Sequence, residues 1–402
     1  MIHTSSKLQT NFLGIQLENP FILSAAPSTD ELGIARDGLE SGWAGLVLKT
    51  TSLVTTKVDL AYPMMSSFGD DREIMGMGNI DLISAYHIDE VAKRVSILKN
   101  EFPNKMIAAS IMSDSKQGWQ TLVGELKSAG VDLIECSFSC PQGNVGEDPG
   151  KMLAQSEPAT EKVASWVKEA AGNTPVLIKI TPQVTDIVAI AGAIQRAGCD
   201  GITASNSIPA LMGIDIETLT PIPDVGGYST YSGLTGAAIK PITLRTIAEI
   251  KRNIPGITIS GNGGVMNWRD AVEVLAVGAA NVQMCTAVML HGFGIIDDLT
   301  SGLDEYLKSK GFTSVDELIG KALPSLTNHD NLPRRQVRSS VVIDRCIGCG
   351  RCYIACRDGG HRAINWDSAK RLPAVDEDKC VGCGLCLLVQ PVDDCLIMKE
   401  IN

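Results

Sequence analysis

Two dense runs of cysteine lie near the end of this 402-residue chain. The first run is Cys346, Cys349, Cys352 and Cys356, and the second is Cys380, Cys383 and Cys386. Runs of the form C-x2-C-x2-C-x3-C are typical of proteins that bind two 4Fe-4S clusters, whereas zinc sites use paired C-x2-C knuckles. The spacing therefore predicts two 4Fe-4S clusters.

The pattern also predicts which residues bind each cluster, because the fourth cysteine of a run binds the cluster of the other run. The second cluster is expected on Cys356, Cys380, Cys383 and Cys386. The first is expected on Cys346, Cys349 and Cys352 and on the residue before Pro391. That residue is Gln390, where the pattern has cysteine.

Gln390 leaves three interpretations of the first cluster. Its amide oxygen could bind iron and, as a harder ligand than thiolate, change the potential of the cluster. Alternatively, this iron is labile and a three-iron cluster remains. A third interpretation recruits Cys395, but that residue lies five positions later and is expected to pack in the core of the small domain. The first two interpretations are favoured, and the sequence does not choose between them.

Upstream of the cysteines, short apolar segments alternate with helix-like segments. The expected strands are residues 21–27, 45–50, 106–112, 133–139, 176–181, 201–207, 257–265 and 281–289. The expected helices include residues 89–102, 119–130, 185–198 and 269–278. This α/β alternation predicts a parallel (β/α)8 TIM barrel, with an open doubly wound sheet as the alternative.

The domain organisation follows from these two patterns. Residues 1–330 are expected to form the barrel with two further helices at its end, around 295–311 and 314–323. Residues 331–340 are expected to be a linker. Residues 341–402 are expected to be a small two-cluster, ferredoxin-like domain.

Active sites of TIM barrels lie at the C-terminal ends of the strands. Seven of the expected strands end in polar or reactive residues, namely Lys49, Thr50, Ser113, Ser137, Ser139, Cys140, Lys179, Thr181, Ser205, Asn206, Ser207, Asn262, Gly263, Gly264, Cys285 and Thr286. One serine or asparagine there would indicate only a turn or a helix cap. Agreement at seven strand ends predicts a site.

The last two strand ends indicate a bound phosphate. The segment Asn262–Gly264 and the pair Cys285–Thr286 stand where such barrels bind phosphate groups. Because iron-sulfur clusters exchange single electrons, their partner should carry phosphate and split an electron pair, and FMN fits best. No G-x-G-x-x-G follows the first strand, so electrons from NAD(P)H are expected to enter through another polypeptide.

Cys140 opens a loop rich in proline and glycine, within the segment CSFSCPQGNVGEDPG at 136–150. A thiol at this position could donate a proton to a substrate bound over a flavin. By composition alone, Cys136, Cys140, Cys199 and Cys285 would each be small buried side chains.

Composition excludes two classes of partner. The formal net charge of -11 and the pI near 5.0 argue against a nucleic-acid surface. No apolar run is long enough to span a bilayer, and the N-terminus has no secretion-signal pattern, so a cytoplasmic location is expected.

The motifs resemble the FMN and iron-sulfur portion of dihydropyrimidine dehydrogenases, in particular their separate bacterial catalytic subunits. The matching segments include NPF.LS at 19–24, IEC.FSCPQ at 134–142, SG..G.A.KPI.LR at 232–245, C.GCGRCYIAC.DGGH.A at 346–363 and KCVGC.LC at 379–386. The barrel portion is also similar to dihydroorotate dehydrogenases, which lack the fused cluster domain.

The resemblance implies reversible reduction of the 5,6 double bond of uracil or thymine. Electrons would pass from NAD(P)H and FAD on a flavoprotein partner, through the clusters, to FMN and then as hydride to C6, while Cys140 protonates C5. The implied FMN contacts are Ser24, Ala25, Lys49, Thr50, Asn79, Lys179, Ser205, Gly236, Gly263, Gly264, Cys285 and Thr286. The implied pyrimidine contacts are Asn79, Asp81, Ser137, Asn206 and Ser207. A homo-oligomer or hetero-oligomer is also implied.

Three residues depart from the family at the substrate position. Ser137 replaces the usual asparagine, Ser207 replaces threonine, and Asp81 replaces glutamate. Each side chain is shorter, so one hypothesis keeps the cofactors but changes the substrate to orotate or another cyclic molecule. In the alternative interpretation, Ser137 and a water molecule replace the asparagine amide and the substrate is unchanged. In a third hypothesis, the chain is an electron-transfer module without its own substrate, and Gln390 is a sign that catalytic function has been lost.

Overall fold

The computed structural model describes residues 5–53, 60–70, 73–139 and 152–401. The chain divides into two compact units, Met1–Ser325 and Leu326–Asn402, which are described separately. Within the described residues, no helix combines the length and apolar character needed to cross a membrane.

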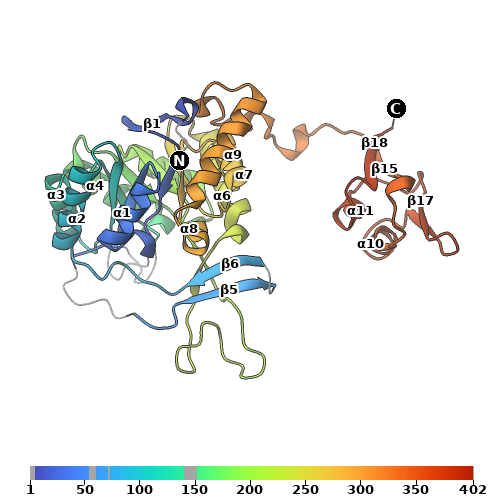
Figure 1. The fold of residues 1–402 in the computed structure, drawn as a ribbon, viewed down its shortest axis with the longest axis horizontal. Helices are drawn as coiled ribbons and strands as arrows, with labels where there is room; N and C mark the ends of the chain where they lie inside the picture. Colours follow the sequence, from blue (N-terminus) through green and yellow to red (C-terminus); the bar gives the residue numbers. More distant parts are fainter. Residues whose placement is uncertain (1–4, 54–59, 71–72, 140–151, 402) are drawn as a thin grey trace. The chain divides into compact units, whose positions relative to one another are not determined.

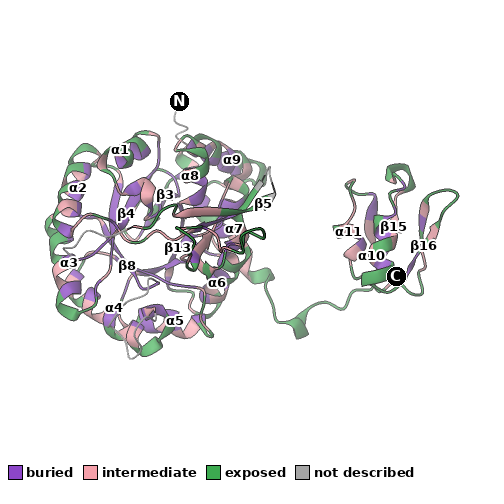
Figure 2. Ribbon diagram, turned by 90° about the horizontal axis from the view of Figure 1, so that it is seen from below, coloured by how far each residue is buried: buried purple, intermediate pink, exposed green. Residues whose placement is uncertain are grey.

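The first unit is a closed parallel barrel, as the alternation predicts, and the open-sheet alternative is wrong (Figure 2). Its strands are β3 (Phe21–Leu23), β4 (Gly45–Thr51), β7 (Met106–Ile111), β8 (Leu133–Ser137), β9 (Val176–Lys179), β10 (Gly201–Ala204), β13 (Thr258–Asn262) and β14 (Asn281–Met284). They pair in chain order, and β14 pairs with β3 to close the sheet. Each strand lies within one of the eight predicted segments or extends one residue beyond it.

Helices surround the barrel and turn their exposed faces outward (Figures 1 and 2). They are α1 (Leu32–Glu40), α2 (Ile88–Glu101), α3 (Lys116–Ser128), α4 (Glu157–Ala171), α5 (Ile187–Arg196), α6 (Lys240–Asn253), α7 (Trp268–Ala276), α8 (Thr286–His291) and α9 (Ile295–Lys310). Local chemistry sets their ends: Asp186 caps α5 by accepting two backbone N–H bonds, and Gly311 ends α9 with φ of +75°. The prediction of an α-helix at 314–323 is wrong, because the chain there forms the 3-10 turn Val315–Glu317 and begins a second one, Leu323–Ser325.

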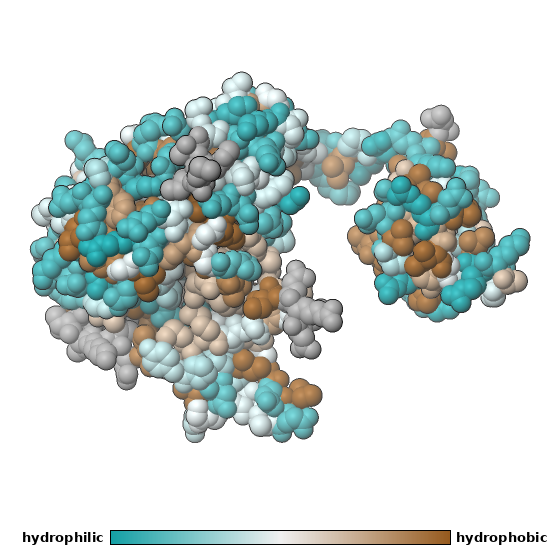
Figure 3. Space-filling view, viewed as in Figure 1, coloured by the Kyte–Doolittle hydropathy of each residue, from teal (hydrophilic) through white to brown (hydrophobic). Residues whose placement is uncertain are grey.

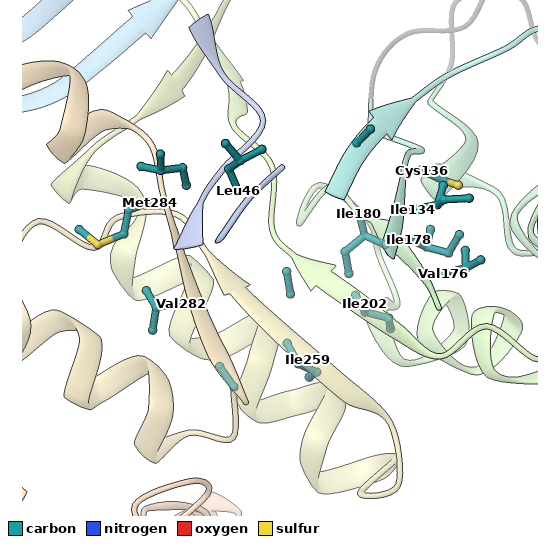
Figure 4. Close-up of a cluster of buried hydrophobic side chains, with 14 of the residues drawn as sticks. Leu46, Ile134, Cys136, Val176, Ile178, Ile180, Ile202, Ile259, Val282 and Met284 are labelled. Atoms are coloured by element: carbon teal, nitrogen blue, oxygen red, sulfur yellow. The ribbon is translucent and has the colours of Figure 1, made fainter. Parts of the chain in front are cut away.

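Alternation along each strand separates two environments. On β8, Ile134 and Cys136 belong to the apolar layer between strands and helices, shown in Figure 4. The intervening Glu135 bonds to side chains on β10 and β14, neither of which neighbours β8 in the sheet. Because successive side chains of a strand point to opposite faces, Glu135 points into the barrel.

A second sheet, which the sequence did not predict, stands apart from the barrel strands. It is antiparallel and has the order β11 (Ile208–Ala210), β12 (Ser232–Thr235), β6 (Glu73–Asn79) and β5 (Met65–Asp70). β-Carbon atoms at Gly76 and Gly78 would lie 2.1 Å from Phe68 Cε1 and 2.4 Å from Met212 Cγ, so glycine permits the close packing there. Large apolar side chains are exposed on this sheet, at Phe68 and Ile74, and between β11 and β12, at Ile216, Leu219 and Tyr228. Figure 3 shows hydrophobic residues on the molecular surface.

Two short strands, β1 (Thr10–Phe12) and β2 (Ile15–Leu17), form an N-terminal hairpin. The second unit contains two more antiparallel pairs, β15 (Val337–Val341) with β18 (Leu396–Glu400), and β16 (Ile364–Asp367) with β17 (Leu372–Val375). Its helices are α10 (Arg351–Gly359) and α11 (Leu385–Leu388). The linker expected at 331–340 therefore overlaps strand β15, which begins the small domain earlier than predicted.

Candidate functional site

A cavity of about 820 Å³ lies at the C-terminal ends of the barrel strands. Every predicted flavin or pyrimidine contact that the structure describes lines this cavity, namely Ser24, Ala25, Lys49, Thr50, Asn79, Asp81, Ser137, Lys179, Ser205, Asn206, Ser207, Gly236, Gly263, Gly264, Cys285 and Thr286. Their common placement follows from the parallel sheet, because the ends of all its strands meet at one rim. The predicted proton donor Cys140 lies outside the described residues.

Lys49, on β4, is 8% exposed and lies between two carboxylates. Its Nζ lies 2.8 Å from Asp81 Oδ2 and 4.0 Å from Asp30 Oδ2. Burial raises the pKa of Asp30, while a hydrogen bond from Ser84 and the charges of Lys49 and Arg94 oppose that shift. The lysine is thus held in place by the protein and presents a cation at the cavity wall.

Lys179 ends β9 and is 5% exposed. Its Nζ donates to Ser24 Oγ at 3.4 Å and lies 3.9 Å from Glu135 Oε1. Glu135 is fully buried inside the barrel, so Lys179 supplies the charge that a buried carboxylate requires. This second cation therefore sits between the barrel interior and the cavity.

The glycine segment after β13 passes close to the start of α6. Gly263 and Gly264 have φ of +115° and +81°. A β-carbon at Gly264 would lie 2.4 Å from the backbone nitrogen of Lys240, and one at Gly263 would lie 2.8 Å from Thr243 Oγ1. Only glycine satisfies both the positive φ and this approach, so backbone groups form this part of the cavity wall.

The unpredicted sheet supplies another part of the wall. Asn79 ends β6, pairs with Gly233 of β12, and donates from Nδ2 to the Gly233 carbonyl at 3.1 Å. A β-carbon at Gly233 would lie 2.5 Å from Ser207 Oγ, which shows how closely these residues pack. The antiparallel sheet thus brings Asn79 beside residues more than a hundred positions away.

Asn206, just beyond β10, is oriented by two hydrogen bonds. Its Nδ2 donates to Ser139 Oγ at 2.6 Å, and its Oδ1 accepts from the Ser207 backbone N–H at 2.9 Å. The amide is therefore fixed at the rim of the cavity.

Buried polar atoms in the cavity wall fit a polar ligand. Three side-chain oxygen atoms, Ser205 Oγ, Ser232 Oγ and Gln283 Oε1, are buried and have no hydrogen-bond partner among the described residues. All three residues line the cavity. Unpaired buried polar groups are costly, so a ligand that bonds to them would be favoured. This polar wall, the two lysines and the glycine segment together suit an anionic flavin cofactor.

The barrel cysteines separate into two kinds. Cys136 and Cys199 are buried in the apolar layer, as composition predicted, and burial raises the pKa of the Cys199 thiol to about 12. Cys285 lines the cavity instead, next to the start of α8. Burial raises its pKa to about 11, with Lys179 lowering it and Asp81 adding to the rise.

In the small domain, the cysteines surround two separate cavities. One is lined by Cys356, Cys380, Cys383 and Cys386, the set expected for the second cluster. The other is lined by Cys346, Cys349 and Cys352, together with Gln390 and Cys395. Within the described ranges, no three His, Cys, Asp or Glu side chains meet closely enough for a single metal ion. Two thiol-lined cavities suit the larger 4Fe-4S clusters.

Sequence reasoning missed several parts of the barrel cavity. Gln283 reaches it from the middle of β14, and Ser232 and Gly233 reach it from β12. The pattern of polar residues at strand ends identifies neither group. The only available signal for Gln283 is a polar residue within an apolar strand.

Comparisons with known proteins agree with both units. A family model described as dihydroorotate dehydrogenase matches residues 7–307, and one described as a 4Fe-4S dicluster domain matches residues 340–398. These matches imply FMN and two 4Fe-4S clusters.

The relatives include NAD-dependent dihydropyrimidine dehydrogenase subunit PreA of Escherichia coli K12, 36% identical over 91% of this chain and 89% of the relative. Chloroplastic dihydropyrimidine dehydrogenase (NADP(+)) of Arabidopsis thaliana is 33% identical over 80% of this chain and 78% of the relative. The catalytic subunit of dihydroorotate dehydrogenase B (NAD(+)) of Methanothermobacter thermautotrophicus is 32% identical over 78% and 98%. The chain therefore belongs to the dihydroorotate dehydrogenase family and is an oxidoreductase of the dihydropyrimidine dehydrogenase type, homologous to PreA.

Proposed function

We propose that the chain reversibly reduces the 5,6 double bond of uracil or thymine. The observation behind the proposal is that every described residue expected to contact flavin or pyrimidine lines one cavity. The dihydropyrimidine dehydrogenase names of two relatives support the substrate class. FMN, when bound, would supply a hydride to C6 of the pyrimidine.

The protein's own residues would hold the cofactor by charge and by backbone contacts. Gly263 and Gly264 line the cavity and would offer backbone N–H groups to a phosphate, and Thr286 at the start of α8 would contribute a donor. Lys49 and Lys179 are buried cations at the cavity wall. They would stabilise negative charge that develops on the cofactor.

The amides of Asn79 and Asn206 would orient the pyrimidine. A carboxamide presents one acceptor and two donors, which complement the imide edge of the ring. Hydrogen bonds within the protein fix both amides before substrate arrives, so these side chains lose little rotational freedom on binding. Asp81, Ser137 and Ser207 would complete the pocket.

Cys140 would deliver the proton to C5. It follows Ser139, which lies at the cavity and accepts the Asn206 hydrogen bond. A positioned general acid contributes roughly a hundredfold or more to the rate.

Electrons would come from a second subunit that carries FAD and the NAD(P)H site, and would pass through the two clusters. The subunit name of PreA supports a partner of this kind. The cytoplasmic location expected from the sequence stays a prediction.

A second candidate substrate is orotate or another cyclic molecule of similar size. The shorter side chains of Asp81, Ser137 and Ser207 line the cavity and favour this alternative, as does the similarity to a dihydroorotate dehydrogenase subunit. An electron-transfer module without a substrate is the remaining alternative.

The deciding experiment starts from anaerobic protein that contains flavin and clusters. After chemical reduction, uracil, thymine or orotate is added and flavin reoxidation is followed by absorbance. Rapid reoxidation by uracil or thymine is expected. Reoxidation by orotate alone would shift the assignment to the second candidate, and reoxidation by none of the three would argue against both.

A further inference from the structure

The cavity expected to hold the first cluster contains one more cysteine than the spacing rule assigns to it. Cys346, Cys349 and Cys352 line it, and so do both Gln390 and Cys395. Cys395 is 8% exposed and belongs to the small apolar core, as expected, but it also borders this cavity. Two residues therefore compete for the fourth ligand position.

The oxygen of Gln390 is already engaged by the protein. Gln390 Oε1 accepts the backbone N–H of Leu396 at 2.9 Å and the thiol of Cys395 at 3.4 Å. A carboxamide oxygen accepts about two hydrogen bonds, so both of its acceptor positions are used. To bind iron, the amide oxygen would have to give up one of these two bonds, either the bond to Leu396 that fixes the start of β18 or the bond from the Cys395 thiol.

The turn at residues 391–394 explains why Cys395 lies in this cavity despite its later position. Asp394 has φ of +57°, a left-handed conformation that aspartate tolerates better than most residues. Arg345, which immediately precedes Cys346, donates to the Asp393 carbonyl and to Asp394 Oδ2, both at 3.2 Å. The turn is thus tied to the first cysteine run.

Hydrogen bonds also fix the backbone of Cys395. Its carbonyl accepts the Val342 N–H at 2.9 Å, next to the pairing of Val341 with Leu396. Its own N–H donates to the Val392 carbonyl at 3.3 Å. Val342, which precedes the first cysteine run, and Val392, in the turn before β18, therefore hold the backbone of Cys395 in place.

We infer that Cys395, and not Gln390, is the fourth ligand of the cluster bound by Cys346, Cys349 and Cys352. Thiolate is the usual ligand of a 4Fe-4S cluster, whereas a neutral amide is a weaker partner for it. On binding, the Cys395 S–H bond breaks, its proton passes to water, and an iron–sulfur bond forms without a change in oxidation state. Gln390 keeps its hydrogen bond to Leu396.

This inference rests on the proposed presence of the clusters and is independent of the substrate. The test uses full-length protein purified anaerobically, with iron and sulfide content and electron paramagnetic resonance as readouts. Cys395→Ala is expected to lose one iron from the first cluster or the whole cluster, with a three-iron signal in the oxidised protein in the first case. Gln390→Ala is expected to retain two four-iron clusters.

The second cluster is the internal control for folding, because Cys356, Cys380, Cys383 and Cys386 are untouched. The double variant Cys395→Ala with Gln390→Cys is expected to regain the four-iron cluster, since it restores the family spacing. A four-iron first cluster in Cys395→Ala, or its loss in Gln390→Ala, would overturn the inference. Should Cys395→Ala fail to fold, the Gln390→Ala result decides alone.

The iron measurements involve no pyrimidine, so their outcome is separate from that of the reoxidation experiment. A protein with intact clusters that reduces no pyrimidine would contradict the proposed substrate and leave this ligand assignment standing. Conversely, a four-iron cluster in Cys395→Ala would overturn the ligand assignment even if uracil were reduced.

Discussion

Lys179 Nζ lies 3.9 Å from Glu135 Oε1, where the interior of the barrel meets the cavity. Glu135 is fully buried, and its other oxygen accepts hydrogen bonds from Thr203 at 2.7 Å and Gln283 at 3.0 Å. The carboxylate thus ties three strands to one lysine at the site. The pair therefore links charge balance inside the barrel to the wall of the cavity.

Glu135→Gln should destabilise the protein because it leaves the buried Lys179 without its charge partner. We expect a loss of about 3 kcal/mol in the free energy of unfolding, measured by urea denaturation. Thr203→Val removes one hydrogen bond to the same carboxylate but keeps the ion pair, so it should cost only about 1 kcal/mol. Equal effects of the two variants would show that the charge pair is unimportant.

Lys49→Met should weaken FMN binding, because it removes a buried cation and leaves Asp30 and Asp81 facing the cofactor. We expect affinity to fall by about tenfold or more, as for loss of an interaction with a charged group. Fluorescence titration of the FMN-free protein measures it. Lys99→Met is the matched control, because Lys99 pairs with Asp132 at 2.7 Å and neither residue lines the cavity. An unchanged affinity in Lys49→Met would exclude the proposed contact.

Gly264→Ala should combine backbone strain with a collision. Gly264 has φ of +81°, and its added β-carbon would lie 2.4 Å from the nitrogen of Lys240. We expect a loss of about 3 kcal/mol in stability and severe loss of FMN. Gly311 has a similar φ of +75° but open space around it, so Gly311→Ala should cost about 1 kcal/mol and leave FMN bound. Thermal unfolding and flavin content distinguish the two.

Alkylation of Cys285 should be slow at neutral pH, because the thiolate is the reactive form and burial raises the pKa of this thiol to about 11. The rate should rise as pH approaches that value, and FMN should protect the thiol. Because the folded pKa exceeds the ordinary 9.0, the contribution of Cys285 to stability is present below pH 9 and lost as pH rises toward 11. Cys285→Ser should remove this pH dependence. Mass spectrometry of alkylated peptides gives the rates, and fast labelling at pH 7 would contradict the prediction.

Cys140→Ala should reduce uracil turnover by about a hundredfold or more while leaving flavin content unchanged, because the proposed role of this thiol is proton donation. Steady-state kinetics with a partner reductase measures the effect. Cys199→Ala is the control, since Cys199 is buried away from the cavity. Unchanged turnover in Cys140→Ala would favour the electron-transfer alternative.

The sequence by itself determined the barrel strands, the two cysteine runs and many of the polar residues that line the cavity. Strands buried on both faces are recognised as short apolar segments. A parallel barrel brings their C-terminal ends together at one rim, independently of the loop sequences. Lys49, Lys179 and Gly263 could therefore be placed from their positions after strands. The two cysteine runs were equally accessible, because iron-sulfur binding imposes fixed spacing, but the spacing left the fourth ligand of the first cluster open.

Tertiary structure alone decided the antiparallel sheet, the partners of Lys49 and Lys179, and the position of Cys395. The strands β6 and β12 lie more than a hundred residues apart and pair through backbone bonds, which leave no mark on residue type. Cys395 reaches the first cysteine run because Asp394 turns the chain and Arg345 holds that turn. Spacing rules count residues along the chain, whereas a ligand is selected by where the folded chain places its sulfur atom.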